Sequence, residues 1–161
     1  MKLESVDIRD FLSIGEIHLQ IANQGLVGVF GINSDSAGLS SNGAGKSSLF
    51  DAISWGLYGR TLRNISGDHV IRRGTKTAEV TIKLYDDNEQ EWTISRSRGA
   101  KNNLTLTCGG RDKSGRVPTI TQNTIVLLTG LTWEMFCTLA VVGGDAIRFA
   151  RSTDSEQKAI L

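Results

Sequence analysis

The chain has 161 residues, a formal net charge of +1 and two cysteines. Its length suffices for one domain with a buried core, and its mixed charges do not indicate a general polyanion binder. Cys108 and Cys137 form neither a C-x-x-C metal pair nor a disulfide framework, which is typical of a reducing compartment. Because no apolar run reaches membrane-spanning length and no signal-peptide pattern is present, we expect a soluble, cytoplasmic protein without membrane contact.

The first predicted elements are three strands. Apolar residues alternate through residues 3–8 and 17–21, which predicts two half-buried strands joined by a turn near Ser13. The continuous apolar run at residues 26–30 predicts a fully buried strand that leads into a glycine-rich stretch.

Residues 42–48 read Asn-Gly-Ala-Gly-Lys-Ser-Ser, and this glycine-rich stretch is the most informative motif of the chain. Glycines let backbone N–H groups face anionic oxygens, Lys46 would reach the β and γ phosphates of a nucleotide, and the Ser47 hydroxyl would ligate Mg²⁺. The following helix adds a positive dipole end. The predicted nucleotide-binding residues here are Asn42, Gly43, Ala44, Gly45, Lys46, Ser47 and Ser48.

The motif departs from the strict pattern G-x-x-x-x-G-K-[ST], because Ser40 stands where glycine is required. We interpret residues 31–48 as a phosphate loop into which a polar flap, about residues 33–42, has been inserted. Loop closure entropy rises only slowly with length, so such an insertion costs little. The alternatives are a decayed loop and a chance match.

A helix follows the motif, with Leu49, Phe50, Ile53 and Leu57 expected on its buried face. Alternation through residues 80–94 predicts a β-hairpin, and residues 104–106 predict a third strand beside it.

Two short helices, over residues 120–129 and 132–140, are predicted next. Gly130 separates them, and Thr132 is a suitable N-cap for the second.

The last residues carry a capping box, in which Thr153 caps a helix and Glu156 occupies its third position. Because this helix stops after two turns, we expect the chain to be the N-terminal piece of a longer protein; a frayed terminal helix is the alternative.

The sequence also offers no clear carboxylate for Mg²⁺. Asp86 and Asp87 follow a half-exposed strand, and two glycines precede Asp145. The chain therefore reads as half of an active site.

Several segments together resemble SbcC-type and SMC-like ATPases of DNA double-strand-break repair, and the phage-encoded members most of all. The opening residues 1–13 resemble "MKLxxVxIxNFxSxG", residues 42–59 resemble "NGxGKSSLxDAIxxxLYG", and residues 149–161 resemble "FLxxxxxERxxIL".

This resemblance implies an α/β fold, the N-terminal lobe of an ABC-type P-loop ATPase head. Residues 1–150 would form the lobe, with a mixed sheet around the P-loop helix and an antiparallel β subdomain, and residues 151–161 would begin a coiled-coil helix. The implied ligands are ATP and Mg²⁺. The implied partners are a C-terminal lobe of the same protein, a second copy of the head, an SbcD-type nuclease and double-stranded DNA.

Two departures from the family pattern affect the expected site. Gly143 stands where relatives carry a glutamine, so Asp145 or a water would have to substitute at the metal, or hydrolysis would be slow. Leu12 replaces a basic residue, so the base and ribose contacts would come from the flap, from Arg60 and Arg63, or from the backbone near Ser13.

Arg96, Arg98 and Lys101 are the candidate nucleic-acid contacts, because Arg96 and Arg98 share one face of a strand. A solvated strand face is the alternative. His18 and His69 are expected to be structural.

Three functions remain open at this point. The favoured one is an ATPase lobe, with Lys46 as its catalytic residue, that hydrolyses ATP only when completed and dimerised, and that gates DNA for a nuclease. The second is a nucleotide-gated DNA clamp with little turnover. The third is a stand-alone P-loop kinase or nucleotidase.

Overall fold

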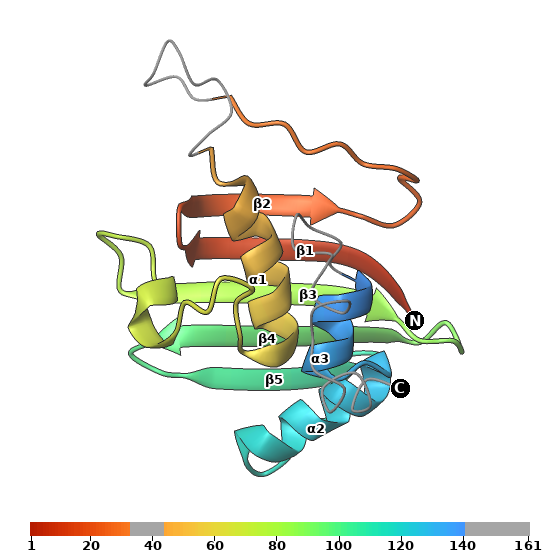
Figure 1. Ribbon diagram of the computed structural model, residues 1–161. Coiled ribbons are helices and arrows are strands. Elements are labelled where there is room, and N and C mark those ends of the chain that lie inside the picture. Colours follow the sequence, from red (N-terminus) through yellow and green to blue (C-terminus); the bar gives the residue numbers. More distant parts are fainter. Residues whose placement is uncertain (33–43, 141–161) are drawn as a thin grey trace, which may run out of the picture.

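The computed structural model describes residues 1–32 and 44–140. An antiparallel sheet in the order β2-β1-β3-β4-β5-β6 forms one layer, and α1 lies across one of its faces (Figure 1). The strands are β1 (Lys2–Phe11), β2 (Ile14–Gln20), β3 (Thr77–Tyr85), β4 (Glu91–Gly99), β5 (Asn103–Cys108) and β6 (Arg111–Asp112). The helices are α1 (Lys46–Tyr58), the 3-10 helix η1 (Gly67–Val70), α2 (Pro118–Thr129), the single turn α3 (Trp133–Met135) and the π-helical stretch η2 (Phe136–Ala140).

The strands form where apolar and polar residues alternate. In β3 the side chains of Val80, Ile82 and Leu84 are completely buried, and the register places Val80 opposite Ile8 of β1. Because the side-chain period of a strand is two, this register gathers the buried apolar side chains of the two strands on the face that α1 covers. The predicted N-terminal strand pair, the β3–β4 hairpin, the strand β5 and the α/β class are confirmed.

Helix α1 packs closely on the middle of the sheet. The rings of Trp55 and Phe11 lie 5.3 Å apart between their centroids, and a Cβ atom at Gly56 would meet Ile82 Cδ1 at 2.7 Å and Val80 Cγ1 at 2.9 Å. Glycine at position 56 therefore allows the helix to approach β3. The predicted buried face is wrong at Phe50, which is 49% exposed, because Ala52 and Trp55 take the positions nearest the sheet.

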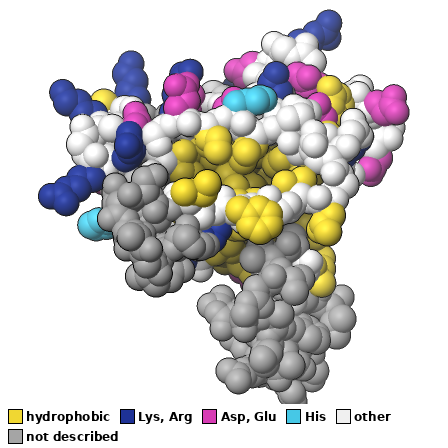
Figure 2. Space-filling view, turned by 90° about the horizontal axis from the view of Figure 1, so that it is seen from above, with side chains coloured by type: hydrophobic (Ala, Val, Ile, Leu, Met, Phe, Trp, Pro, Cys, Tyr) yellow, Lys and Arg dark blue, Asp and Glu magenta, His cyan; other side chains and the backbone are white. Residues whose placement is uncertain are grey.

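The predicted buried strand at residues 26–30 is not formed. Leu26 is fully exposed and Phe30 is 92% exposed, and the segment runs as coil past β2 (Figure 1). Residues 26–30 form no ladder with any described strand, although β2 is an edge strand, so their backbone and side chains are not enclosed by the sheet. Figure 2 looks down on this side of the molecule and shows apolar side chains open across the middle of the face.

The helix predicted over 120–129 is confirmed as α2, which ends at Gly130 with a φ of 67°. The helix predicted over 132–140 begins as expected, because the Thr132 side chain accepts a hydrogen bond from the Met135 amide. It then changes to the π-helical stretch η2. The Thr138 hydroxyl donates to the Glu134 carbonyl at 2.9 Å. In a regular α-helix the same carbonyl would accept from the Thr138 amide, so the hydroxyl competes with the backbone there.

Some predicted features lie outside the described residues. These are the flap at 33–42 with Asn42, together with Gly43, Gly143, Asp145 and the helix from Thr153.

Replacing Gly56 with alanine tests the close packing of α1 on β3. Alanine favours the helix by up to about 1 kcal/mol, but its Cβ would overlap Val80 and Ile82, and overpacking of this kind costs about 1–3 kcal/mol. We expect a net loss of unfolding free energy in a urea titration. Phe50→Ala on the exposed side of α1 is the control and should lose less; a Gly56→Ala variant as stable as the parent chain would contradict the packing.

Candidate functional site

The site is built at the N-terminus of α1. Gly45 is the N-cap residue in the left-handed region, with a φ of 85°, and it offers no side chain to cap the helix. The first turn contains Lys46 and Ser47 and no acidic residue. This helix start, with the positive end of the dipole and with a lysine and a hydroxyl in its first turn, suits an anion.

A cavity of about 630 Å³ opens at this helix end. Its size is that of typical small-molecule sites. Its described lining is cationic and contains no Asp or Glu, so it suits an anionic ligand. The lining residues are Leu12, Ser13, Ala44, Gly45, Lys46, Ser47, Ser48, Arg63, Ile65, His69, Ile71 and Arg73.

Three segments distant in sequence form the cavity wall. The β1–β2 turn contributes Leu12 and Ser13, and the Leu12 amide donates to the Val70 carbonyl at 2.8 Å. Phe11 forms an isolated β-bridge with Ile71. These bonds bring η1 and the residues after it to the mouth of the cavity, opposite the start of α1.

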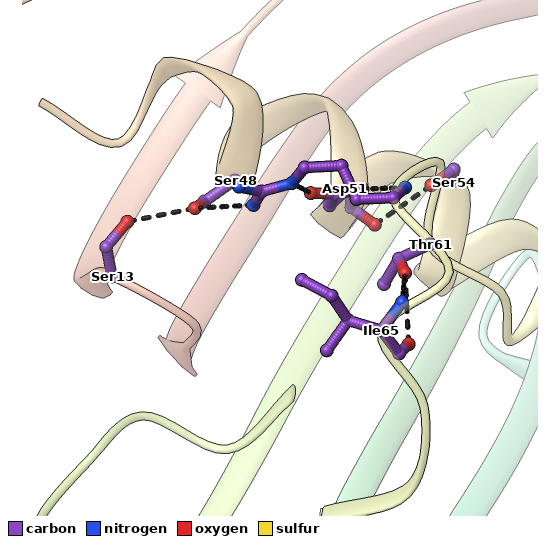
Figure 3. A network of polar contacts seen from close by, with 7 residues as sticks. Ser13, Ser48, Asp51, Ser54, Thr61 and Ile65 are labelled. Atoms are coloured by element: carbon purple, nitrogen blue, oxygen red, sulfur yellow. Dashed lines mark hydrogen bonds and ion pairs between the residues drawn. The ribbon is translucent and has the colours of Figure 1, made fainter. Parts of the chain in front are cut away.

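A chain of polar contacts connects the turn, the helix and the loop after it (Figure 3). Ser13 Oγ donates to Ser48 Oγ at 2.9 Å, and Arg63 Nη2 donates to the same oxygen at 3.2 Å. Arg63 Nε donates to Asp51 Oδ2 at 2.5 Å, and the Arg63 amide donates to Asp51 Oδ1 at 3.2 Å. A buried carboxylate needs such partners, and Asp51 is completely buried.

Six of the predicted nucleotide-binding residues come together on this cavity. They are Ser13, Ala44, Gly45, Lys46, Ser47 and Ser48. Ser48 is only 5% exposed, and its hydroxyl oxygen accepts hydrogen bonds from Ser13 and Arg63 at the cavity wall.

Sequence reasoning missed part of the lining. His69 was expected to be structural, Arg73 was considered only as a surface charge or nucleic-acid contact, and Ile65 and Ile71 were not singled out, yet all four line the cavity. The local sequence carries no signal for them, because the long-range pairing of Phe11 with Ile71 brings them there. Arg63, which was considered together with Arg60 as a source of base and ribose contacts, does line the cavity.

The acidic residues of the hairpin turn do not serve the cavity. Asp86 accepts hydrogen bonds from Trp92 Nε1 and from the amides of Asn88 and Gln90, and these bonds hold the pKa of its carboxyl below the usual value. Asp87 pairs with the N-terminal amino group at 2.6 Å. Within residues 1–32 and 44–140, no three His, Cys, Asp or Glu side chains form a group that could hold a metal ion.

Arg96, a predicted nucleic-acid contact, is bonded within the domain. Arg96 Nε donates to the Gly56 carbonyl, Nη2 donates to Gln122 Oε1, and the guanidinium lies 5.9 Å from the centroid of the Trp55 ring. Burial lowers the pKa of Arg96 to about 10. Its strand face points toward α1, so this side chain secures the C-terminal end of the helix.

The other two basic residues lie nearer to solvent. Arg98 pairs with Asp68 at 2.7 Å and is 36% exposed, while Lys101 is exposed.

None of the helices in the described part of the chain is long and apolar enough to span a bilayer.

A family model described as an AAA domain matches residues 5–136. The chain belongs to this family. Relatives of this AAA domain include a protein of Sulfurisphaera tokodaii named "DNA double-strand break repair Rad50 ATPase", 31% identical over 151 residues. A protein of the same name from Sulfolobus acidocaldarius is 29% identical over 113 residues.

These two alignments cover 89% and 68% of the chain, but only 16% and 13% of the relatives' own lengths. A solved structure from work on ATP-driven dimerisation and DNA-stimulated activation of SMC ATPases superposes with a TM-score of 0.69 at 20% identity. That superposition covers 99% of this chain and 97% of the other. The AAA domain thus has the fold of an SMC- or Rad50-like N-terminal lobe of an ABC-type ATPase head.

Replacing Arg96 with alanine tests its structural role. The Gly56 carbonyl and Gln122 would lose their donor and the Trp55 ring would lose a packing partner, so we expect a loss of about 1–3 kcal/mol in unfolding free energy. Lys101→Ala, at an exposed site, should change stability by less than about 0.5 kcal/mol. Equal stability of the two variants in a urea titration would contradict the assignment.

Proposed function

We propose that this AAA domain is the ATP-binding half of an ATPase that acts in DNA double-strand-break repair or recombination. The observation that carries the proposal is the start of α1: an N-cap glycine, Lys46 and Ser47 open on a cationic cavity whose described lining has no carboxylate. Lys46 and the leading amides would bind the β and γ phosphates. The names and alignments of the Rad50 relatives support the choice of reaction class.

Mg²⁺ is part of the proposal. The Ser47 hydroxyl lies at the cavity and is exposed, so it could contribute one ligand to an ion that bridges the phosphates. Mg²⁺ keeps several waters and needs few protein ligands, which agrees with a single serine on this side. The ion would supply charge neutralisation at the phosphates. Asp145, a second candidate ligand from the sequence, remains a prediction.

The cavity alone would not hydrolyse ATP efficiently, because phosphoryl transfer also needs a group that positions the attacking water. We infer that this group comes from a C-terminal lobe of the same protein and that two such heads close on ATP. The apolar residues at 26–32 support a covering polypeptide, since Leu26, Phe30 and Ile32 are each at least 87% exposed. We also propose that the closed pair of heads controls the access of an SbcD-type nuclease to DNA. This complex would act in the cytoplasm.

Lys101, and Arg98 beside it, remain our candidates for DNA phosphate contacts. Arg98 lies near the end of β4 and Lys101 follows that end, where Thr77 pairs with Gly99 and brings the exposed Lys76 close. Such contacts would add salt-dependent affinity without sequence preference.

The second candidate function is a nucleotide-gated DNA clamp with little turnover. Gly143, where relatives carry glutamine, favours it. The rate of phosphate release by the completed head dimer separates the two candidates: steady turnover supports the ATPase, and ATP-dependent dimerisation without turnover supports the clamp. Hydrolysis by this chain alone as a monomer would favour a stand-alone kinase or nucleotidase instead.

Replacing Lys46 with alanine tests the phosphate site. Removal of a charge-assisted contact should weaken ATP binding by about tenfold to a hundredfold and abolish ATP-dependent dimerisation. Titration of a fluorescent ATP analogue measures the affinity, and Lys83→Ala on the opposite face of the sheet is the control. Unchanged affinity in Lys46→Ala would overturn the phosphate-loop assignment.

Replacing both Leu26 and Phe30 with serine tests the covering polypeptide. Both side chains are exposed, so the unfolding free energy of the chain should stay within about 0.5 kcal/mol of the parent. Association with the C-terminal lobe, measured by calorimetry, should weaken by about tenfold or more. The matched control is Leu127→Ser, at another exposed apolar residue; equal weakening by both changes would count against a specific interface at residues 26–32.

A further inference from the structure

We propose that Asp51 is a positioning residue, which holds Arg63 in place as the cationic wall of the nucleotide cavity. The inference rests on the proposed function and deepens it, because it assigns a task to two residues outside the phosphate motif. Asp51 itself does not line the cavity, whereas Arg63 does.

The carboxylate of Asp51 holds Arg63 at two points. Oδ2 accepts from the side chain and Oδ1 accepts from the backbone amide of the same residue. Asp51 is completely buried while the Arg63 side chain is 49% exposed. The Asp51 carboxylate is therefore fixed inside the domain, while the Arg63 side chain that it holds reaches the solvent-accessible cavity.

Ser48 provides the second contact that orients the guanidinium. It lies one helical turn before Asp51 on the same face of α1, and its oxygen accepts from Arg63 Nη2. A guanidinium has five N–H donors in a planar fork, and these two side-chain bonds occupy one edge of it. The remaining donors are left for the cavity side.

The loop that carries Arg63 is itself fixed. Thr61, which is 3% exposed, accepts from the Ile65 amide at 2.6 Å and donates to the Ile65 carbonyl at 3.0 Å. The Asn64 amide also donates to the Thr61 carbonyl at 3.1 Å. Both the backbone and the side chain of Arg63 are thus ordered without a ligand.

Ordering before binding has a functional consequence. An arginine that is free in solution must lose rotamer freedom when it meets a phosphate, and preorganisation removes that cost. Arg63 can therefore add its charge to that of Lys46 with no rearrangement. Without Asp51 the guanidinium would be free to turn into solvent.

The test is Asp51→Asn, which keeps side-chain acceptor capacity and removes the charge that holds Arg63. We expect ATP affinity to fall by about tenfold, the size of one charge-assisted contact. Arg63→Ala should produce a similar loss, and the double variant should lose no more than Arg63→Ala alone. Asp68→Asn, which breaks the exposed ion pair with Arg98, is the matched control and should leave ATP affinity unchanged.

The double-mutant cycle separates positioning from a merely structural role. Unchanged ATP affinity in Asp51→Asn overturns the inference, and so does a loss of the same size in the presence and absence of Arg63. Thermal unfolding monitors the fold; if Asp51→Asn does not fold, Ser48→Ala is measured in the same cycle against Arg63→Ala. Absence of Lys46-dependent ATP binding in the parent chain would overturn the proposed function, and this inference with it.

Discussion

The position of α1 on the sheet is the constraint on which the rest of the molecule depends. The helix lies close to β3 because Gly56 has no side chain to hold it away from Val80 and Ile82. Its two ends then have different tasks. The C-terminal end is secured, since Arg96 donates to the Gly56 carbonyl and Gln122 donates to the Leu57 carbonyl. The N-terminal end is left without a side-chain cap and opens on the cavity. A helix held firmly at one end keeps the leading amides of the other end in a defined place.

The charges of the domain are divided in a way that leaves the cavity cationic. Three acidic residues close in sequence to lining residues are engaged with arginines: Asp51 with Arg63, Asp10 with Arg72, and Asp68 with Arg98. Each pair removes a carboxylate that could otherwise neutralise the cavity, while Lys46 and Arg73 still line it. An anionic ligand is favoured for this reason, and a divalent cation without its phosphates is not. Under the proposed function, the carboxylates of a complete ATPase site come from outside residues 1–32 and 44–140, from Asp145 or from a C-terminal lobe.

Local patterns predicted the elements whose stability is decided locally or by one neighbouring strand. Alternation predicted β1, β2 and the β3–β4 hairpin, and the Gly-Lys-Ser sequence predicted the start of α1. The errors arose where tertiary context decides. Phe50 is apolar and yet faces solvent, Arg96 looks like a surface charge and yet bonds to the end of α1, and His69 reaches the cavity only because Phe11 pairs with Ile71. None of these long-range relations leaves a periodic trace in the sequence.

The apolar run at residues 26–30 shows how a correct pattern can predict an unformed element. Its composition is that of a buried parallel strand, but burial requires polypeptide on both sides, and the described residues provide no strand that pairs with it. In the sequence, the same run leads directly into the predicted phosphate loop at residue 31. Under the proposed function, a C-terminal lobe that pairs with this run would also fix the start of the loop. Lobe docking and ATP binding would then favour one another, and by linkage each would strengthen the other by the same factor.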